Sequence, residues 1–457
     1  MHLSLFRLYR PDIMATLRIS LPIIIGQLGT VMMGVADNIQ VGALGAASIA
    51  AAGIANSVFF LFALFGLGTL SVIAPQVATA NGRNEKMECS MLLRAGFRLG
   101  IGLGILIGLI LLFLSLNFHW FRQTPEVEAL AVEYLQIISI SVVPMFFFMA
   151  IKQFSDGLSH TRVAMVITIG GLLFNVFFNW VLIHGKLGFP QWGLNGAGVA
   201  TMLARLFMAV GMLGYIFRSS LFYGYINKPP TGYSFTPLLK KLLRLGVPGG
   251  FQLFFEGGAF SGAAIIAGWL GTIALAAHQI ALNLATITYM VAAGISSAGA
   301  IRVGQAVGIG SHTKIVRAGT VSLALSIAFM SMACFVFLTF NYSLVRLYIQ
   351  DEAVVNLGAA LLIIGGFFQL SDGVQVVGLG ILRGIEDVNV PTVIALFAYW
   401  VIGLPLGYVL GFTLNMHAQG IWLGLLAGLT VSAILLTIRF YTLTYKMKAS
   451  KHLRTMG

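Results

Sequence analysis

Apolar residues run along this chain in long stretches that are separated by short polar or charged breaks. Windows of about 20 mostly apolar residues, the length that crosses a bilayer as a helix, begin near residues 15, 48, 92, 131, 162, 195, 243, 273, 316, 354, 391 and 419. The pattern predicts an all-α integral membrane protein with twelve transmembrane helices. The first stretch, Ile19 to Val35, already has spanning length, so we expect a retained helix rather than a signal peptide.

The chain also matches itself when it is shifted by 226 or 227 residues, which predicts two homologous halves. The matching positions include Pro22 and Pro248, the segments GALG (42–45) and GWLG (268–271), and Gly157 and Gly384. Six spans return the chain to its starting side of the membrane, so the halves share one orientation. We therefore expect two six-helix lobes related by a pseudo-two-fold axis along the membrane normal.

The predicted domains are an N-terminal lobe (1–217), a cytoplasmic linker (218–240) and a C-terminal lobe with a basic tail (241–457). The linker contains the segment NKPPTGYSFTP, whose prolines and glycine resist a continuous helix. Substrate sites of such repeats lie at the lobe interface near mid-bilayer. A two-lobed helical bundle with a central cleft is the expected architecture.

Composition and charge fit a membrane protein and set its orientation. Of the 457 residues, 58% are hydrophobic and 9% are charged, and the formal net charge is +13. The basic residues fall almost entirely on one side of the twelve-span arrangement, and the opposite side holds only Arg122, Lys186 and Arg346. The positive-inside rule then places both termini and the linker in the cytoplasm, and explains the charge without nucleic acid. Cys89 and Cys334 show no disulfide or zinc-site spacing.

Three carboxylates, Asp37, Glu256 and Asp372, lie well inside predicted spans. An ionised carboxylate at the bilayer centre costs at least about 2.5 kcal/mol, so such residues usually face a protein interior or a wet cavity and serve ion or substrate pathways. The alternative is a structural polar contact between helices. Glu256 and Asp372 lie at similar depth, roughly 18 Å and 16 Å along their helices from Arg244 and Arg383, which predicts a pair in the C-terminal lobe.

Other polar residues follow the acids at helical spacing and are candidates for lining cavities in the two lobes. They are Gln27, Asn38, Asn175, Asn179, Gln252, Gln279, Asn283 and Gln369, and the aromatic Phe368 beside Gln369 is a further candidate. His278 is interpreted as a satisfied hydrogen-bond donor between helices. Arg205, in the middle of the sixth span, could neutralise an acid, extend toward the interface, or mark a wrongly placed boundary.

Five segments are distributed over essentially the whole chain: LPIIIGQLGTVMMGVADNIQVGALG, PGGFQLFFEGGAF, ALAAHQIALN, GAIRVGQAVGIG and LRGIEDVNVP. In order and spacing they resemble the MATE (multidrug and toxic compound extrusion) family in its bacterial NorM-like branch. The resemblance implies a multi-pass antiporter of the bacterial inner membrane. Such a protein contacts membrane lipid, acts as a monomer and exports amphiphilic, mostly cationic compounds in exchange for Na⁺ or H⁺, with no cofactor besides that ion.

The resemblance also implies roles for the three acids. Glu256 and Asp372 match the family's cation-site acids, and Asp37 matches the acid associated with proton or substrate coupling. This chain has Phe368 where some relatives carry a tyrosine four residues before the tenth-helix acid, so we expect a hydroxyl ligand to be missing.

Two other functions remain open as alternatives. A flippase for lipid-linked precursors, in the same superfamily, would more naturally carry basic residues in its cavity than three acids. An intramembrane enzyme would need a nucleophile and a base, or metal ligands, and the sequence contains no HExxH or GxSxG motif. A Walker loop is also absent, which argues against ATP as the direct energy source.

Overall fold

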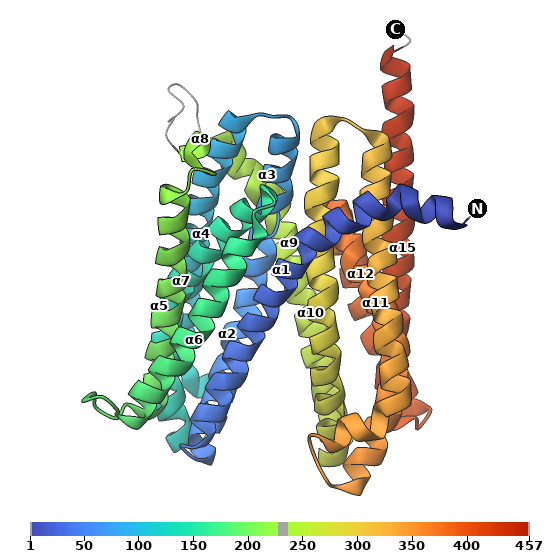
Figure 1. The fold of residues 1–457 in the computed structure, drawn as a ribbon. Coiled ribbons are helices and arrows are strands. Elements are labelled where there is room, and N and C mark those ends of the chain that lie inside the picture. The colour runs from blue at the N-terminus through green and yellow to red at the C-terminus, as the bar shows by residue number, and fades with distance from the viewer. Residues whose placement is uncertain (1, 227–235, 456–457) are drawn as a thin grey trace. The chain divides into compact units, whose positions relative to one another are not determined.

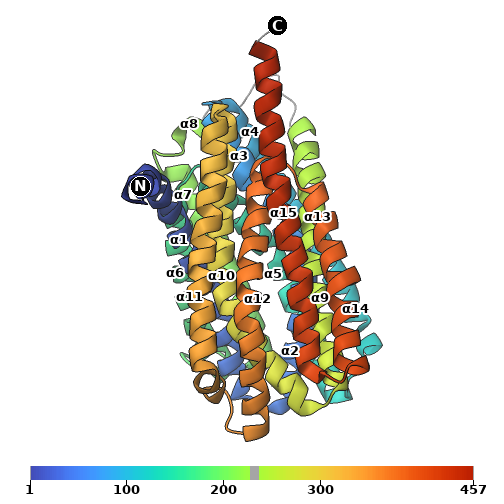
Figure 2. The same cartoon turned by 90° about the vertical axis from the view of Figure 1, so that its right-hand side faces the viewer.

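The computed structural model describes residues 2–226 and 236–455, and these residues form a helical protein (Figures 1 and 2). The first half comprises α1 (His2–Gly42), α2 (Ala46–Leu70), α3 (Ile73–Gly82), α4 (Lys86–Leu116), η1 (Phe118–Phe121), α5 (Pro125–Gly157), α6 (Thr161–His184), α7 (Gly193–Arg218) and α8 (Tyr223–Ile226). The second half comprises α9 (Thr236–Trp269), α10 (Thr272–Ile309), α11 (His312–Arg346), α12 (Glu352–Gly384), α13 (Asn389–Leu396), η2 (Phe397–Gly403), α14 (Leu404–Tyr408), η3 (Val409–Thr413) and α15 (His417–Thr455).

Within the described residues, 12 helical segments are long and apolar enough to cross a membrane. Two of them are composite: α2 and α3 form one span (Ala46–Gly82), and the elements from α13 to η3 form another (Asn389–Thr413). The twelve-span prediction is therefore confirmed. The structure also shows where the eleventh span departs from regular α-helix, because η2 and η3 are π-helical.

The chain divides into two compact units. One contains Met1–Ile24 together with Phe251–Gly457, and the other contains Ile25–Gly250. Both boundaries lie inside helices, α1 and α9, and each follows a proline, Pro22 or Pro248, by a few residues. The lobes expected from the sequence (1–217 and 241–457) differ from these units at the starts of the two helices. Residues 227–235 of the expected linker lie outside the described residues.

The first part of each of these helices packs against the other half of the chain. In the Ile25–Gly250 unit, a Cβ atom on Gly68 would overlap the carbonyl group of Gly249 and lie 2.9 Å from the Cα atom of Gly250. In the other unit, a Cβ atom on Gly294 would lie 3.3 Å from the Cα atom of Ile24. The 226-residue repeat relates Gly68 to Gly294 and Ile24 to Gly250. The two halves therefore exchange equivalent segments.

A second contact is also repeated. A Cβ atom on Gly157 would lie 2.5 Å from the carbonyl oxygen of Ala74, and a Cβ atom on Gly384 would lie 2.8 Å from that of Ala300. In both places only glycine lets the backbones approach so closely. Helix starts are repeated too, because α2 and α10 each follow a glycine with φ near +105°, a conformation that favours glycine: Gly45 (φ 103°) and Gly271 (φ 108°).

One long helix lies at the centre of each half. In the first half α5 packs against α2, α4 and α7, and in the second α12 packs against α10, α11 and α15. Buried aromatic residues of the second half, Phe368, Tyr399 and Trp422, belong to one hydrophobic cluster. Buried acids occur beside this cluster.

Candidate functional sites in the two units

Two acids of the Phe251–Gly457 segment are buried. Glu256 on α9 is 6% exposed, and Asp372 on α12 is 3% exposed. The two carboxyl groups are close enough to interact electrostatically. Arg383 lies on α12 about three helical turns beyond Asp372. It also interacts electrostatically with Glu256. Buried carboxyl groups need polar partners, because an unpaired buried charge is costly.

The hydroxyl group of Tyr399 supplies such a partner. It lies 3.3 Å from Oε1 of Glu256 and 3.3 Å from Oε1 of Gln375, so oxygen atoms from α9, α12 and η2 meet at one point. A phenol carries one proton, which can be donated to only one of the two acceptors at a time. The other oxygen contact is satisfied by a proton on the carboxyl group, by a rotated Gln375 amide that turns its N–H group toward the phenol, or by a positive ion between the oxygens. Carboxylate, amide and hydroxyl oxygens are ligands that hard cations prefer.

Sequence reasoning missed Tyr399. The residue lies in the segment FAYWVIG, which forms the π-helical turn η2, and it is fully buried. Its only sequence signal was a phenol within an apolar span, a pattern also typical of interfacial residues. Phe368 is buried as well and packs against Phe260 and Trp422 with ring centroids 6.1 Å and 5.5 Å away. A hydroxyl group is therefore present beside Glu256, but it comes from the eleventh span.

Buried amides surround the two acids. Gln252 precedes Glu256 by one helical turn and is 2% exposed. Gln369 accepts a hydrogen bond of 2.7 Å from the Thr288 hydroxyl group of α10. The Nε2 atoms of Gln369 and Gln375 are buried and have no hydrogen-bond partner in the described part of the chain. Buried amides are usually hydrogen-bonded, and rotation of either amide would turn its N–H group toward the hydroxyl that its Oε1 atom now contacts.

His278 lies on α10 and is fully buried. Its Nδ1 atom accepts a hydrogen bond of 3.1 Å from the indole nitrogen of Trp422 on α15. The neutral ring then carries its proton on Nε2, which is also without a partner among the described residues. His278 thus links two helices, as an acceptor rather than as a donor.

The third acid, Asp37 on α1, belongs to the Ile25–Gly250 unit. Its carboxylate accepts hydrogen bonds from the amide of Asn179 (2.5 Å) and from the hydroxyl of Thr201 (3.2 Å). Asn175 connects both donors, because it donates to Thr201 (3.2 Å) and accepts from Asn179 (3.3 Å). Neutral donors from α6 and α7 therefore hold the carboxylate. Asn175 and Asn179 were expected from the sequence, and Thr201 was not.

Arg205 lies one turn beyond Thr201 on α7. Its guanidinium donates a hydrogen bond of 2.6 Å to the Ser141 hydroxyl of α5 and lies 4.6 Å from the centre of the Phe59 ring. Arg205 also interacts electrostatically with Asp37. Its position within α7 agrees with the sixth span as placed from the sequence.

The structure does not bring all candidate residues to the acids. Asn38, Gln279 and Asn283 have exposed side chains, and none has a hydrogen bond to an acid among the residues described here. Gln27 is half-buried, and its Oε1 atom is buried without a partner in the same described part. These four residues line the surfaces of their units and do not join the buried clusters.

Comparisons with known proteins agree with this architecture. The MatE family model matches residues 22–181 and again residues 248–409, and the two matches begin 226 positions apart, like the repeat. The chain is 34% identical to a probable multidrug resistance protein NorM from Rhizobium meliloti (strain 1021), over 95% of this chain and 94% of that protein. It is also 34% identical to the multidrug resistance protein MdtK of Yersinia pseudotuberculosis serotype O:1b, over 94% and 95% of the two chains.

Solved structures share the fold. An outward-facing multidrug resistance MATE family transporter aligns with a TM-score of 0.88 at 19% identity, over 96% of this chain and 97% of that chain. A MATE protein in a bent conformation aligns with a TM-score of 0.87 at 20% identity, over 97% and 98%.

Proposed function

Because this chain belongs to the MatE family of transporters, we propose that it is a secondary antiporter that exports amphiphilic, mostly cationic compounds in exchange for Na⁺ or H⁺. The multidrug resistance proteins NorM and MdtK, to which it is similar along almost its full length, support export of drug-like compounds. The buried acids Glu256 and Asp372 and the half-buried Asp37 support the coupling to a cation.

One observation carries this proposal: Tyr399 places its hydroxyl 3.3 Å from an oxygen of Glu256 and 3.3 Å from an oxygen of Gln375. With Asp372 nearby on α12, the cluster has two carboxylates, an amide oxygen and a hydroxyl oxygen. We assign Glu256 and Asp372 to the coupling cation. Binding of that cation neutralises charge which is otherwise costly inside a membrane protein.

Asp37 has a separate role in this proposal. Its repeat-related position is Ala263, which is fully buried and packs in an apolar cluster. The two halves have thus diverged at this site. Asp37 would bind a cationic substrate when ionised and release it when protonated, because only a difference in affinity between two states can drive a switch.

The proposal also includes the oligomeric state, the membrane and the orientation of the transporter. It would work as a monomer in the bacterial inner membrane, in contact with lipid, with both termini in the cytoplasm. The distribution of Lys and Arg residues supports this orientation. The two six-helix lobes would alternate in access to the two sides of the membrane.

Counterflow in proteoliposomes tests the function without knowledge of the native substrate. Vesicles containing the purified chain are loaded with ethidium, and either a Na⁺ gradient or a pH gradient is imposed alone. We expect one of the two gradients to drive ethidium movement, and an anionic dye not to move. Movement of anionic lipid-linked compounds, with no response of ethidium to either gradient, would instead support a flippase.

A further inference from the structure

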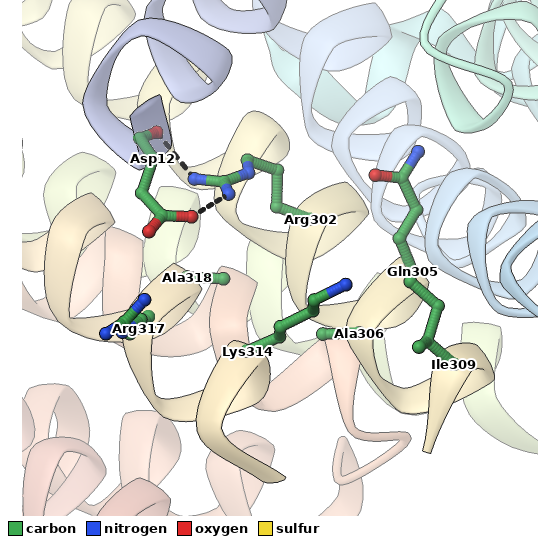
Figure 3. Close-up of a pocket in the computed structure, with 8 residues that line it drawn as sticks. All are labelled: Asp12, Arg302, Gln305, Ala306, Ile309, Lys314, Arg317 and Ala318. Carbon is green, nitrogen blue, oxygen red and sulfur yellow. Dashed lines mark hydrogen bonds and ion pairs between the residues drawn. The ribbon is translucent and has the colours of Figure 1, made fainter. Parts of the chain in front are cut away.

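A pocket of about 360 Å³ lies where the exchanged start of α1 meets α10 and α11 (Figure 3). Its lining residues are Asp12, Arg302, Gln305, Ala306, Ile309, Lys314, Arg317 and Ala318. All of them belong to the compact unit that contains Met1–Ile24 and Phe251–Gly457. The pocket shares no residue with the acid clusters. We propose that it binds the phosphate group of an anionic phospholipid headgroup.

The charges in the pocket do not balance. Arg302 donates hydrogen bonds to the backbone oxygen of Asp12 (2.6 Å), to the Asp12 carboxylate (2.5 Å) and to the Thr16 hydroxyl (2.8 Å). This pairing uses the one carboxylate that lines the pocket. Lys314 and Arg317 remain as two positive charges, and Lys314 has no ion pair or hydrogen bond among the described residues. In Figure 3 these two residues come from α11 and lie below the pair of Asp12 and Arg302.

Arg317 lines the pocket and offers a planar group of N–H donors to a phosphate. Its guanidinium lies over the Tyr9 ring, 5.6 Å from the ring centre. A contact of this kind attracts the cation to the ring face and uses none of its N–H groups as donors to an oxygen. A planar guanidinium can donate two parallel hydrogen bonds to a phosphate, while the ammonium group of Lys314 acts as a point charge.

The position of the pocket favours a lipid as the source of the phosphate. It lies where one candidate span (Thr272–Ile309) ends and the next (His312–Arg346) begins, which is the level of the headgroups. The Ile309 side chain at its rim is 53% exposed and offers an apolar surface to the start of an acyl chain. Basic pockets between transmembrane helices on the cytoplasmic side suit anionic headgroups.

Binding of phosphatidylglycerol to the purified full-length protein, measured by native mass spectrometry over a range of lipid concentrations, tests the proposal. The variants are Lys314→Gln and Arg317→Gln, and Lys314→Arg keeps the charge. Arg162→Gln is the matched control, because Arg162 is an exposed cation in the first turn of α6. Phosphatidylcholine serves as the uncharged lipid, and inorganic phosphate as the soluble competitor. Thermal unfolding of each variant shows that it is folded.

We expect each glutamine variant to bind phosphatidylglycerol about fivefold more weakly, as expected for one basic residue near the membrane surface. Lys314→Arg and Arg162→Gln should bind like the native protein. Equal losses for phosphatidylcholine, or unchanged binding in both glutamine variants, would overturn the proposal. Displacement of the lipid by millimolar inorganic phosphate would also overturn it, since the site would then belong to a soluble anion. The assay does not involve transport, so its result is independent of the antiport proposal.

Discussion

The phenol of Tyr399 and the carboxylate of Glu256 meet at 3.3 Å although they come from different spans, and one of these spans is π-helical at that point. π-helical turns within α-helices are frequent at functional sites. Because Phe368 stands where some relatives carry a tyrosine, the sequence predicted that a hydroxyl ligand is missing. In the structure the π-helical turn supplies a hydroxyl group from Tyr399. The composition of the site is therefore set by three-dimensional packing rather than by the residues of the tenth span alone.

Tyr399→Phe should weaken cation coupling while leaving the protein folded. The change removes one hydroxyl and keeps the ring in its apolar cluster, so we expect the apparent affinity for the coupling cation to fall about fivefold to tenfold, the effect of one hydrogen bond worth roughly 1 kcal/mol. The measurement is the cation dependence of ethidium counterflow. Tyr408→Phe is the control, because Tyr408 lies in the same span but is exposed and stacks on Phe412. An equal effect in both variants would argue against a specific role for Tyr399.

Glu256→Gln and Asp372→Asn should each reduce cation-driven efflux by more than about tenfold, because the neutral amides keep the shape and remove a buried charge. Efflux is measured in proteoliposomes containing equal amounts of folded protein. Glu126→Gln is the control, since Glu126 is an exposed residue in the first turn of α5. Normal efflux in both Glu256→Gln and Asp372→Asn would show that these acids do not bind the coupling cation.

Asp37→Asn should change drug binding without changing cation binding at Glu256 and Asp372. Protonation at low pH makes Asp37 neutral and weakens its attraction for a cationic drug, so binding by the native protein should strengthen as pH rises. The test is ethidium binding between about pH 5.5 and 8.5, a range wide enough for a carboxyl group in a protein interior. Asp37→Asn should lose the pH dependence. Glu133→Gln, which alters an exposed acid bonded to Asn195, should keep it. A pH dependence that persists in Asp37→Asn would leave Asp37 with a structural role only.

Gly157→Ala and Gly384→Ala should destabilise the protein to a similar extent. In each variant the new methyl group would meet a backbone oxygen at 2.5 Å or 2.8 Å, and overpacking of this kind costs about 1–3 kcal/mol. Thermal unfolding of the purified variants in detergent measures the effect. Gly102→Ala on α4 is the control, because a Cβ atom there meets nothing within 4 Å. A large effect at only one of the two repeated positions would show that they are not equivalent.

Sequence patterns predicted the twelve spans and the repeat because both depend on local composition and on matching residues. Helical spacing also selected Asn175 and Asn179 as one polar face of the fifth span, and the structure brings this face to Asp37. The same spacing selected Gln279 and Asn283, whose side chains are exposed and have no hydrogen bond to an acid among the described residues. The spacing of polar residues along one helix does not show which other helix, if any, packs against that face.

Tyr399 and Thr201 could not be predicted for a related reason. Thr201 looks like an ordinary small residue of a membrane helix, and its role depends on α1 bringing Asp37 to α7. Tyr399 depends on the π-helical turn, which hydropathy does not detect. The exchange of helix starts at Ile24 and Gly250 was also missed, because a local pattern carries no information on which unit a helix joins.

The reciprocal contacts of Gly68 and Gly294 bear on how such a chain could have arisen. A polypeptide consisting of the first half alone would lack the segment, residues 236–250, that completes its own compact unit. It would also carry an unattached helix start of its own, residues 1–24. Two identical half-length chains could each complete the compact unit of the other by swapping their helix starts. The packing therefore has the connectivity of an intertwined dimer of half-length chains that are joined into one polypeptide.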